Sequence, residues 1–184
     1  MAEQTNTASV DSADRVSWGR RFAAGIADGI LSAILMMGFM MAYSSATGAG
    51  TTMPLKALGA LVYGVEALVA GSMAMLAGAG IQVGFSIVLG ILFALCMSRR
   101  TSIVGSLFAG IAVGIVIWVA MELVVLPYMD PTMAARIALM PMAYFVAHLL
   151  FGIGLGLTPL FIRTFSRSRR DQRHMERPAE ALPI

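Results

Sequence analysis

The feature that most constrains this chain is a set of long apolar stretches. A helix needs roughly 20 predominantly apolar residues to cross a bilayer, because its backbone polar groups must be bonded within the segment. The stretches 22–46, 103–126 and 142–162 meet this requirement, and a fourth span must lie within the apolar region 55–97. Since 58% of the residues are hydrophobic and only 12% are charged, the chain lacks the polar surface of a soluble globule. We therefore expect an all-α membrane protein.

The distribution of Lys and Arg favours four spans over five. One span at about residues 77–98 puts 11 basic residues on one side of the membrane and two on the other, whereas two spans there would divide them nine against four. Basic residues collect in cytoplasmic loops, so four spans predict both termini in the cytoplasm, in a bacterial inner (plasma) membrane. Glu66 in the disputed segment also argues against an extra span. The chain then divides into a polar cytoplasmic tail (1–21), a four-span bundle (22–163) and a basic cytoplasmic tail (164–184).

An internal repeat organises the bundle. "AGIADGI" at 24–30 recurs as "AGIAVGI" at 109–115, and "QVGFSIVLG" at 82–90 aligns with "HLLFGIGLG" at 148–156. Because the order is kept, we interpret the bundle as two tandem hairpins, about 22–98 and about 103–163, related as parallel repeats. The two offsets are 85 and 66 residues, so the first hairpin carries 19 additional residues between its matched segments.

Each hairpin also contains a segment that opens with proline between its two spans. These segments are "PLKALGALVYGVEAL" from Pro54 and "PTMAARIALM" from Pro131. Proline is tolerated in the first turn of a helix, where its missing amide hydrogen is not needed. We expect an outer interfacial or re-entrant helix in each hairpin, and a longer one in the first.

Each predicted span carries one pair of glycines at four-residue spacing. Such pairs let helix backbones approach closely in lipid, which favours a compact bundle or a tight homo-oligomer. The expected helix-packing positions are Gly25, Gly29, Gly80, Gly84, Gly110, Gly114, Gly152 and Gly156.

Polar residues inside the spans are the candidate site. Gln82 and His148 occupy the same register of the two repeats, and Glu122 lies at a similar depth. Tyr43 and Tyr144 fall near them, with Tyr144 on the helix face of His148. These groups either hold the helices together by hydrogen bonds or form a proton or small-solute pathway. One His and one Glu are too few ligands for a closed metal site, so no metal is predicted.

Asp28 is a further candidate because it has no counterpart in the second repeat, where Val113 occupies its place. It can pair with Arg20, Arg21 or Arg163, the alternative we favour, or mark an inner half-channel together with Ser32.

Pro159 predicts a kink in the fourth span. Its missing N–H frees the carbonyl of Leu155, and the hydroxyl of Thr158 can compensate.

No cofactor is predicted. Haem at the histidine and copper at "MMGFMM" (36–41) stay open alternatives, although methionines in a span more often fill packing gaps. The basic tail predicts contact with anionic lipid headgroups of the bilayer and not with nucleic acid.

The pattern of Gln82, Ser86 and Gly90 in the second span, repeated by His148, Gly152 and Gly156 in the fourth, resembles small bacterial inner-membrane proteins of the YagU-like type. The resemblance covers roughly residues 22–163, and Gln82 departs from the histidine expected there. It implies four spans and no established chemistry. We therefore expect a non-enzymatic accessory or interaction protein, or a homo-oligomer. The alternative is a small-solute or proton pathway through the Gln/Glu/His cluster.

Overall fold

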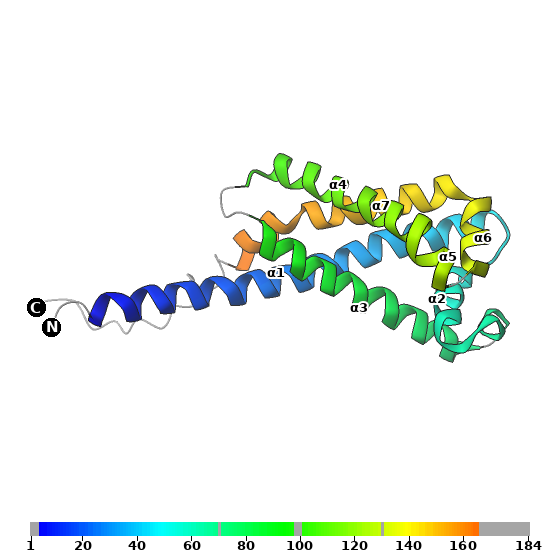
Figure 1. Ribbon diagram of the computed structural model, residues 1–184, viewed down its shortest axis with the longest axis horizontal. Coiled ribbons are helices and arrows are strands. Elements are labelled where there is room, and N and C mark those ends of the chain that lie inside the picture. Colours follow the sequence, from blue (N-terminus) through cyan, green and yellow to red (C-terminus); the bar gives the residue numbers. More distant parts are fainter. Residues whose placement is uncertain (1–3, 70, 98–100, 130, 166–184) are drawn as a thin grey trace, which may run out of the picture.

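A computed structural model describes residues 4–69, 71–97, 101–129 and 131–165 (Figure 1). Within these ranges the chain is helical and contains no strand. The elements are α1 (Gln4–Ala46), α2 (Met53–Tyr63), the 3-10 helix η1 (Val65–Leu68), α3 (Ser72–Cys96), α4 (Ile103–Ala120), the π-helix η2 (Met121–Val125), α5 (Leu126–Met129), α6 (Pro131–Leu139) and α7 (Pro141–Gly156). After a turn at Leu157, residues 158–165 are again helical.

Four helices are long and apolar enough to cross a membrane, as the apolar runs predicted. They cover Trp18–Ala46, Ser72–Cys96, Ile103–Tyr128 and Pro141–Phe165. The second span begins at Ser72, earlier than the predicted start near residue 77, because α3 continues outward beside α2. Helix α1 starts at Gln4, so it runs through most of the tail that was predicted to end at residue 21. Of the predicted basic tail, residues 166–184 lie outside the described ranges.

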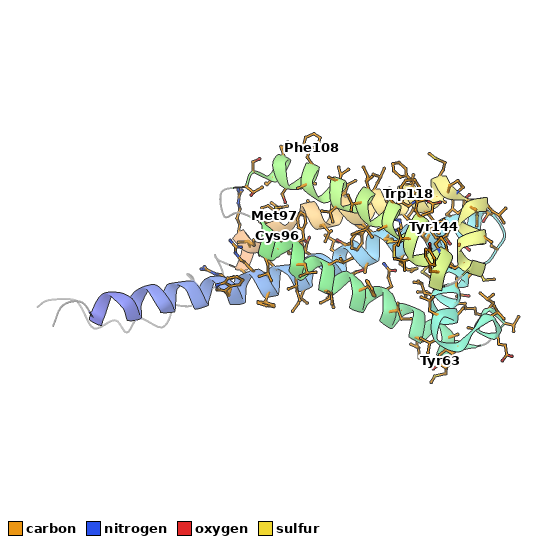
Figure 2. All side chains as sticks on the ribbon, in the orientation of Figure 1. Tyr63, Cys96, Met97, Phe108, Trp118 and Tyr144 are labelled. Carbon is orange, nitrogen blue, oxygen red and sulfur yellow. The ribbon has the colours of Figure 1, made fainter. Side chains whose placement is uncertain are left out.

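The exterior of the bundle is apolar, as expected for helices surrounded by lipid. Phe108 on α4 is 71% exposed and projects away from the bundle in Figure 2. Leu76 on α3 and Val116 on α4 are equally outward-facing, each 66% exposed. In water such a surface would be unfavourable, because exposed apolar area costs free energy.

The bundle has two different ends (Figure 1). The terminal end is the end at which α3 finishes and α4 begins, and at which the described chain ends after α7. The first part of α1 projects beyond the bundle at this end. The opposite end, where α2, η1, α5 and α6 gather, is the connector end. Helix α1 packs against α3 and α7, α4 packs against α7, and α2 packs against α3. Between described residues, α3 and α4 share no contact of comparable extent.

Glycines allow the closest helix contacts. A Cβ atom on Gly25 would lie 2.6 Å from Cα of Ile91, so α1 and α3 touch backbone to backbone. In the same way a Cβ on Gly156 would lie 2.6 Å from Cα of Leu107, where α7 meets α4. Dispersion contacts of this kind associate helices where lipid removes the hydrophobic drive.

The proline-led segment of the first hairpin is not one continuous helix. Helix α2 begins at Met53 with Pro54 in its first turn and ends at Tyr63. Gly64 then adopts a φ of +72°, a left-handed value that favours glycine, and η1 follows as a separate short element. From the sequence we expected one helix for this segment and did not predict the break at Gly64. Proline begins α6 in the second hairpin, at Pro131.

Candidate functional site

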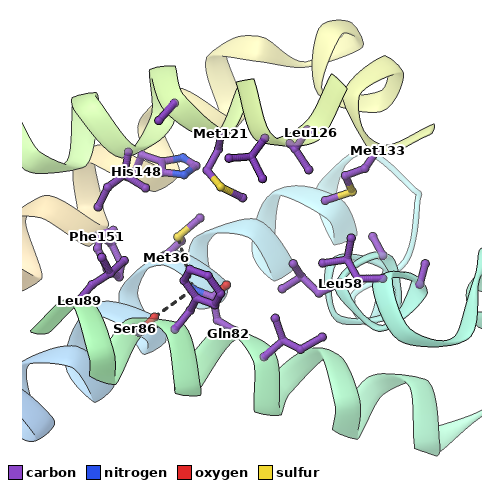
Figure 3. Close-up of a pocket in the computed structure, with 18 of the residues that line it drawn as sticks. Met36, Leu58, Gln82, Ser86, Leu89, Met121, Leu126, Met133, His148 and Phe151 are labelled. Atoms are coloured by element: carbon purple, nitrogen blue, oxygen red, sulfur yellow. Dashed lines mark hydrogen bonds between the residues drawn. The ribbon is translucent and has the colours of Figure 1, made fainter. Parts of the chain in front are cut away.

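A cavity of about 650 Å³ lies between α3 and α4 toward the connector end (Figure 3). This volume falls within the ~300–1,000 Å³ that small-molecule sites occupy. Its walls come from α1, α2, η1, α3, α4, η2, α5, α6 and α7, and they are mostly aliphatic, aromatic and methionine side chains. Apolar residues that line it include Met36, Leu58, Leu89, Met121, Leu126, Met133 and Phe151. The cavity forms because α1 and α7 hold α3 and α4 apart at this level.

Gln82 supplies an amide to the cavity wall. Its Nε2 donates to the Oγ of Ser86 at 3.4 Å and to the Sδ of Met36 at 3.5 Å (Figure 3). The first of these is long for a hydrogen bond and the second goes to a weak acceptor, so the amide is held in place by modest interactions. A stronger partner that enters the cavity can therefore replace them at little cost.

His148 faces Gln82 across the cavity from α7 (Figure 3). The histidine is 9% exposed, and its Nδ1 lies 2.7 Å from the backbone carbonyl oxygen of Tyr144. A carbonyl oxygen only accepts, so Nδ1 must donate. In the neutral imidazole Nε2 is then an acceptor without a proton, which fixes the chemistry that this ring offers to a ligand.

The cavity ends on a packed apolar layer toward the terminal end. Phe93, Phe151 and Leu155 form the buried core cluster, and Phe151 also lines the cavity. Met36 and Leu89 belong to both as well, since they line the cavity and pack against the cluster. This layer closes the cavity toward the terminal end of the bundle.

The mouth of the cavity faces the lipid side of the bundle. Phe85 on α3 lines the cavity and is 66% exposed, and Val65 in η1 lines it and is 60% exposed. Leu61 on α2 is a third such residue. A molecule dissolved in the membrane would reach the interior past these apolar side chains.

Glu122, predicted to share a cluster with Gln82 and His148, does not line the cavity. It sits in η2, where Leu126 N–H donates to the carbonyl of Met121 and the helix widens by one residue. Pro127 follows directly and has no N–H to continue the α-helical pattern. The π-helix places Met121 and Val125 on the cavity wall, while Glu122 is half-buried elsewhere. Sequence reasoning found Glu122 by its charge and missed the π-helix, for which Pro127 was the available signal.

The two predicted tyrosines also lie outside the cavity lining. The ring of Tyr43 stacks on Phe39 of the same helix, with centroids 6.2 Å apart. Tyr144 contributes its backbone carbonyl to His148, one turn away on α7.

Asp28 is hydrogen-bonded to none of Arg20, Arg21 and Arg163, contrary to the favoured prediction. It is fully buried, and its Oδ2 accepts a hydrogen bond from the Oγ1 of Thr158 on the helical segment after α7. Arg21 instead donates to the backbone carbonyl of Leu95 at 2.9 Å, where α3 ends. Ser32, which the other alternative named together with Asp28, is fully buried on the same face of α1.

The break after α7 follows the prediction from Pro159. The helical pattern is interrupted at Leu157, and the Oγ1 of Thr158 donates to the carbonyl of Leu155 at 2.7 Å. The compensation by Thr158 is thus confirmed.

The predicted glycine positions fall into two groups. Gly25, Gly29, Gly110, Gly114, Gly152 and Gly156 lie at helix contacts where a Cβ atom would meet backbone of the neighbouring helix. Gly80 and Gly84 have nothing within 4 Å of such an atom, because they face away from the bundle on α3. Two glycines of α2 and α3 that were not predicted, Gly59 and Gly78, make the close contact between those helices.

In the described part of the chain, no group of three or more His, Cys, Asp or Glu side chains is placed to hold a metal ion. Of the methionines considered for copper, Met36 lines the cavity and Met40 is buried. Cys96, at the end of α3, is a free thiol.

No family model, no curated protein and no solved structure matches the chain.

Proposed function

We propose that this protein is a non-enzymatic membrane component that binds one uncharged amphipathic lipid in the cavity between α3 and α4. The observation that carries the proposal is the pairing of a 650 Å³ apolar cavity with two polar groups, Gln82 and His148, that face each other across it. Apolar walls accommodate a hydrocarbon body, and a few placed polar groups orient one end of a ligand.

The polar end of the ligand is a hydroxyl or a similar neutral group. A hydroxyl can donate to the Nε2 of His148, which has no partner in the neutral ring. It can also accept from the amide Nε2 of Gln82 by displacing the weak bond to the Sδ of Met36. Among the described residues that line the cavity there is no Lys, Arg, Asp or Glu, so a charged headgroup would meet no counter-ion from them. This favours a neutral lipid over a fatty acid or an ammonium compound.

A continuous proton or solute pathway is the weaker candidate. It relied on Glu122 joining Gln82 and His148, and Glu122 does not line the cavity. Toward the terminal end the route meets the buried side chains of Phe93, Phe151 and Leu155, which themselves offer no polar group to carry a proton or solute.

We further infer that both termini lie in the cytoplasm of a bacterial inner membrane, which puts the cavity in the outer half of the bilayer. The excess of Lys and Arg on the terminal side supports this orientation. A duplicated hairpin is supported by the pairing of matched glycines. Gly25 and Gly90 meet in the first half of the chain, and their counterparts Gly110 and Gly156 meet in the second.

Association, either as a homo-oligomer or with another membrane protein, is the second candidate function. It is favoured by Gly80 and Gly84, whose outward face on α3 leaves room for the close approach of another helix. This surface is separate from the cavity, so lipid binding and association are compatible.

A photoreactive lipid tests the proposed binding. The intact protein in lipid nanodiscs is labelled with a hexadecanol that carries a diazirine on its chain, and the labelled peptides are identified by mass spectrometry. We expect labels on the cavity walls contributed by α3 and η2. A carboxylate analogue of the same length should label them much more weakly, since burying its charge is costly.

Matched variants make the test specific. The double variant Gln82→Leu, His148→Phe keeps the volume and removes both polar partners. It should reduce cavity labelling about tenfold, because each neutral hydrogen bond contributes roughly 0.5–1.5 kcal/mol. Glu122→Gln is the control and should label like the wild type. Labels confined to outward residues such as Phe108 would contradict the proposal, and a cross-linked dimer protected from label along α3 would favour association instead.

A further inference from the structure

A second polar group of residues lies buried between α1 and the segment after α7, away from the cavity. Asp28, Ser32 and Thr158 are each 0% exposed. They come from positions far apart in the chain, since Asp28 and Thr158 are separated by 130 residues. None of the three lines the cavity, so this group is independent of the proposed lipid site.

Two oxygen atoms in this group have no hydrogen-bond partner. They are the Oδ1 of Asp28 and the Oγ of Ser32. The two residues are one helical turn apart on α1 and so share a face. Ser32 presses closely on α7, because a Cβ atom at Gly154 would lie 2.5 Å from its Oγ. A buried polar atom without a partner costs about 1–3 kcal/mol, and two neighbouring ones call for a common explanation.

The helix break beside them supplies further oxygen ligands. Pro159 has no N–H to offer the carbonyl of Leu155, which instead accepts from the Oγ1 of Thr158. The same Oγ1 donates to the Oδ2 of Asp28. A hydroxyl has one hydrogen and cannot serve both acceptors at once. Either the carboxyl of Asp28 carries a proton, or the Leu155 carbonyl is available to another partner.

The negative charge of the Asp28 carboxylate also has to be neutralised. Of the described residues nearest this group, the charged ones are Arg20 and Arg21 on α1 and Arg163 after α7. The titratable thiol of Cys96 ends α3. None of them hydrogen-bonds Asp28, whose Oδ1 has no partner and whose Oδ2 is bonded by Thr158. A carboxylate buried in this way requires a positive charge beside it. A proton on Oδ2 would neutralise it but would leave Oδ1 and the hydroxyl of Ser32 unsatisfied.

We propose that Asp28, Ser32 and Thr158, with the freed carbonyl of Leu155, bind one dehydrated Na⁺ in competition with a proton on Asp28. Carboxylate, hydroxyl and carbonyl oxygens are hard donors that suit such an ion. Broken helices in membrane proteins use unwound carbonyls in the same way. The second repeat has Val113 in place of Asp28, so the duplicated hairpins hold one such site and not two.

The stability of the purified full-length protein in detergent tests this site. Thermal unfolding is measured at fixed ionic strength in NaCl, KCl or choline chloride over a range of pH. We expect NaCl to raise Tm more than the other salts, because an ion that binds only the folded state stabilises it. The half-saturating Na⁺ concentration should fall about tenfold for each unit by which the pH is raised, over the pH range in which the Na⁺-free site carries a proton on Asp28.

Three variants locate the effect. Asp28→Asn resembles the protonated carboxyl and should lose the Na⁺ response, and Ser32→Ala should weaken it severalfold. Ser106→Ala is the matched control, because Ser106 is equally buried but its Oγ donates to the Sδ of Met97 on another face of the bundle. Ser106→Ala should keep the full response.

The proposal fails if wild-type Tm is the same in NaCl and choline chloride at every pH, or if the response persists in Asp28→Asn. Should Asp28→Asn not fold, binding of ²²Na⁺ to wild type and Ser32→Ala by equilibrium dialysis decides. Bound ²²Na⁺ that is equal in both proteins, or absent from the wild type, overturns the site.

Discussion

Toward the terminal end, α1 packs on α3 and α4 packs on α7 through glycines, whereas toward the connector end α3 and α4 stand apart and enclose a cavity. At the glycine contacts the backbones touch, as between Gly25 and Ile91. About two and a half turns from Ile91 along α3, Gln82 lines the cavity, and His148 lines it from α7. The pairs α1–α3 and α4–α7 are therefore held by backbone contacts, whereas α3 and α4 leave room between them for a ligand.

Polar groups behave differently in the two halves. Near the connector end, Gln82 and His148 each have a partner that positions them and an edge left for a ligand. Near the terminal end, Asp28 and Ser32 are fully buried with oxygen atoms that no side chain satisfies. This difference is the reason for placing the proposed lipid site in one half and the proposed ion site in the other.

The largest expected effect comes from closing the glycine contacts. In Gly90→Leu, a side chain would be forced into α1, because a Cβ atom there already lies 2.7 Å from the backbone nitrogen of Gly29. Overpacking against backbone should cost about 3 kcal/mol or more and abolish the folded bundle. Gly38→Leu, at an exposed position of α1 with nothing within 4 Å, is the control and should stay folded. The measurement is monodispersity and thermal unfolding in detergent; equal loss in both variants would show that the close contact at Gly90 does not determine stability.

A smaller effect is expected from single hydroxyls, and it should differ between the halves. Thr158→Val keeps the shape but removes the donor shared by Asp28 and the Leu155 carbonyl, so it should lower the free energy of unfolding by about 2 kcal/mol. Ser44→Ala near the connector end removes one bond to the Gly50 carbonyl and should cost about 1 kcal/mol or less. Equilibrium unfolding in mixed micelles compares them. A larger loss of unfolding free energy in Ser44→Ala than in Thr158→Val would show that hydroxyl hydrogen bonds do not stabilise the terminal half more than the connector end.

Much of this fold follows from local sequence signals. The four spans were predictable because crossing a bilayer sets both the length and the composition of a helix, and the Thr158 compensation was predictable because Pro159 removes a specific N–H. The cavity was not predictable, because it depends on which helices fail to touch. The partner of Asp28 was missed for a different reason: only arginines were considered as partners, including Arg163, and the actual partner is the hydroxyl of Thr158 on the same helical segment as Arg163. Local charge placed Glu122 in the cluster, and the π-helix before Pro127 takes it off the cavity wall.

The smallest effect is expected at a third buried atom without a partner, the Nε1 of Trp118 on α4. Its ring packs edge to face on Phe145, with centroids 5.0 Å apart and planes at 69°. No second unsatisfied atom accompanies it, so the interpretation of Asp28 and Ser32 as an ion site does not extend to it. Trp118→Phe removes the unpaired donor and keeps an aromatic ring, and it should change the free energy of unfolding by about 1 kcal/mol or less. It should also leave any response of Tm to Na⁺ unchanged. Trp118→Phe could alter the Na⁺ response as much as Ser32→Ala does. Unsatisfied buried atoms in this bundle would then reflect general packing, and the unsatisfied atoms of Asp28 and Ser32 would not mark an ion site.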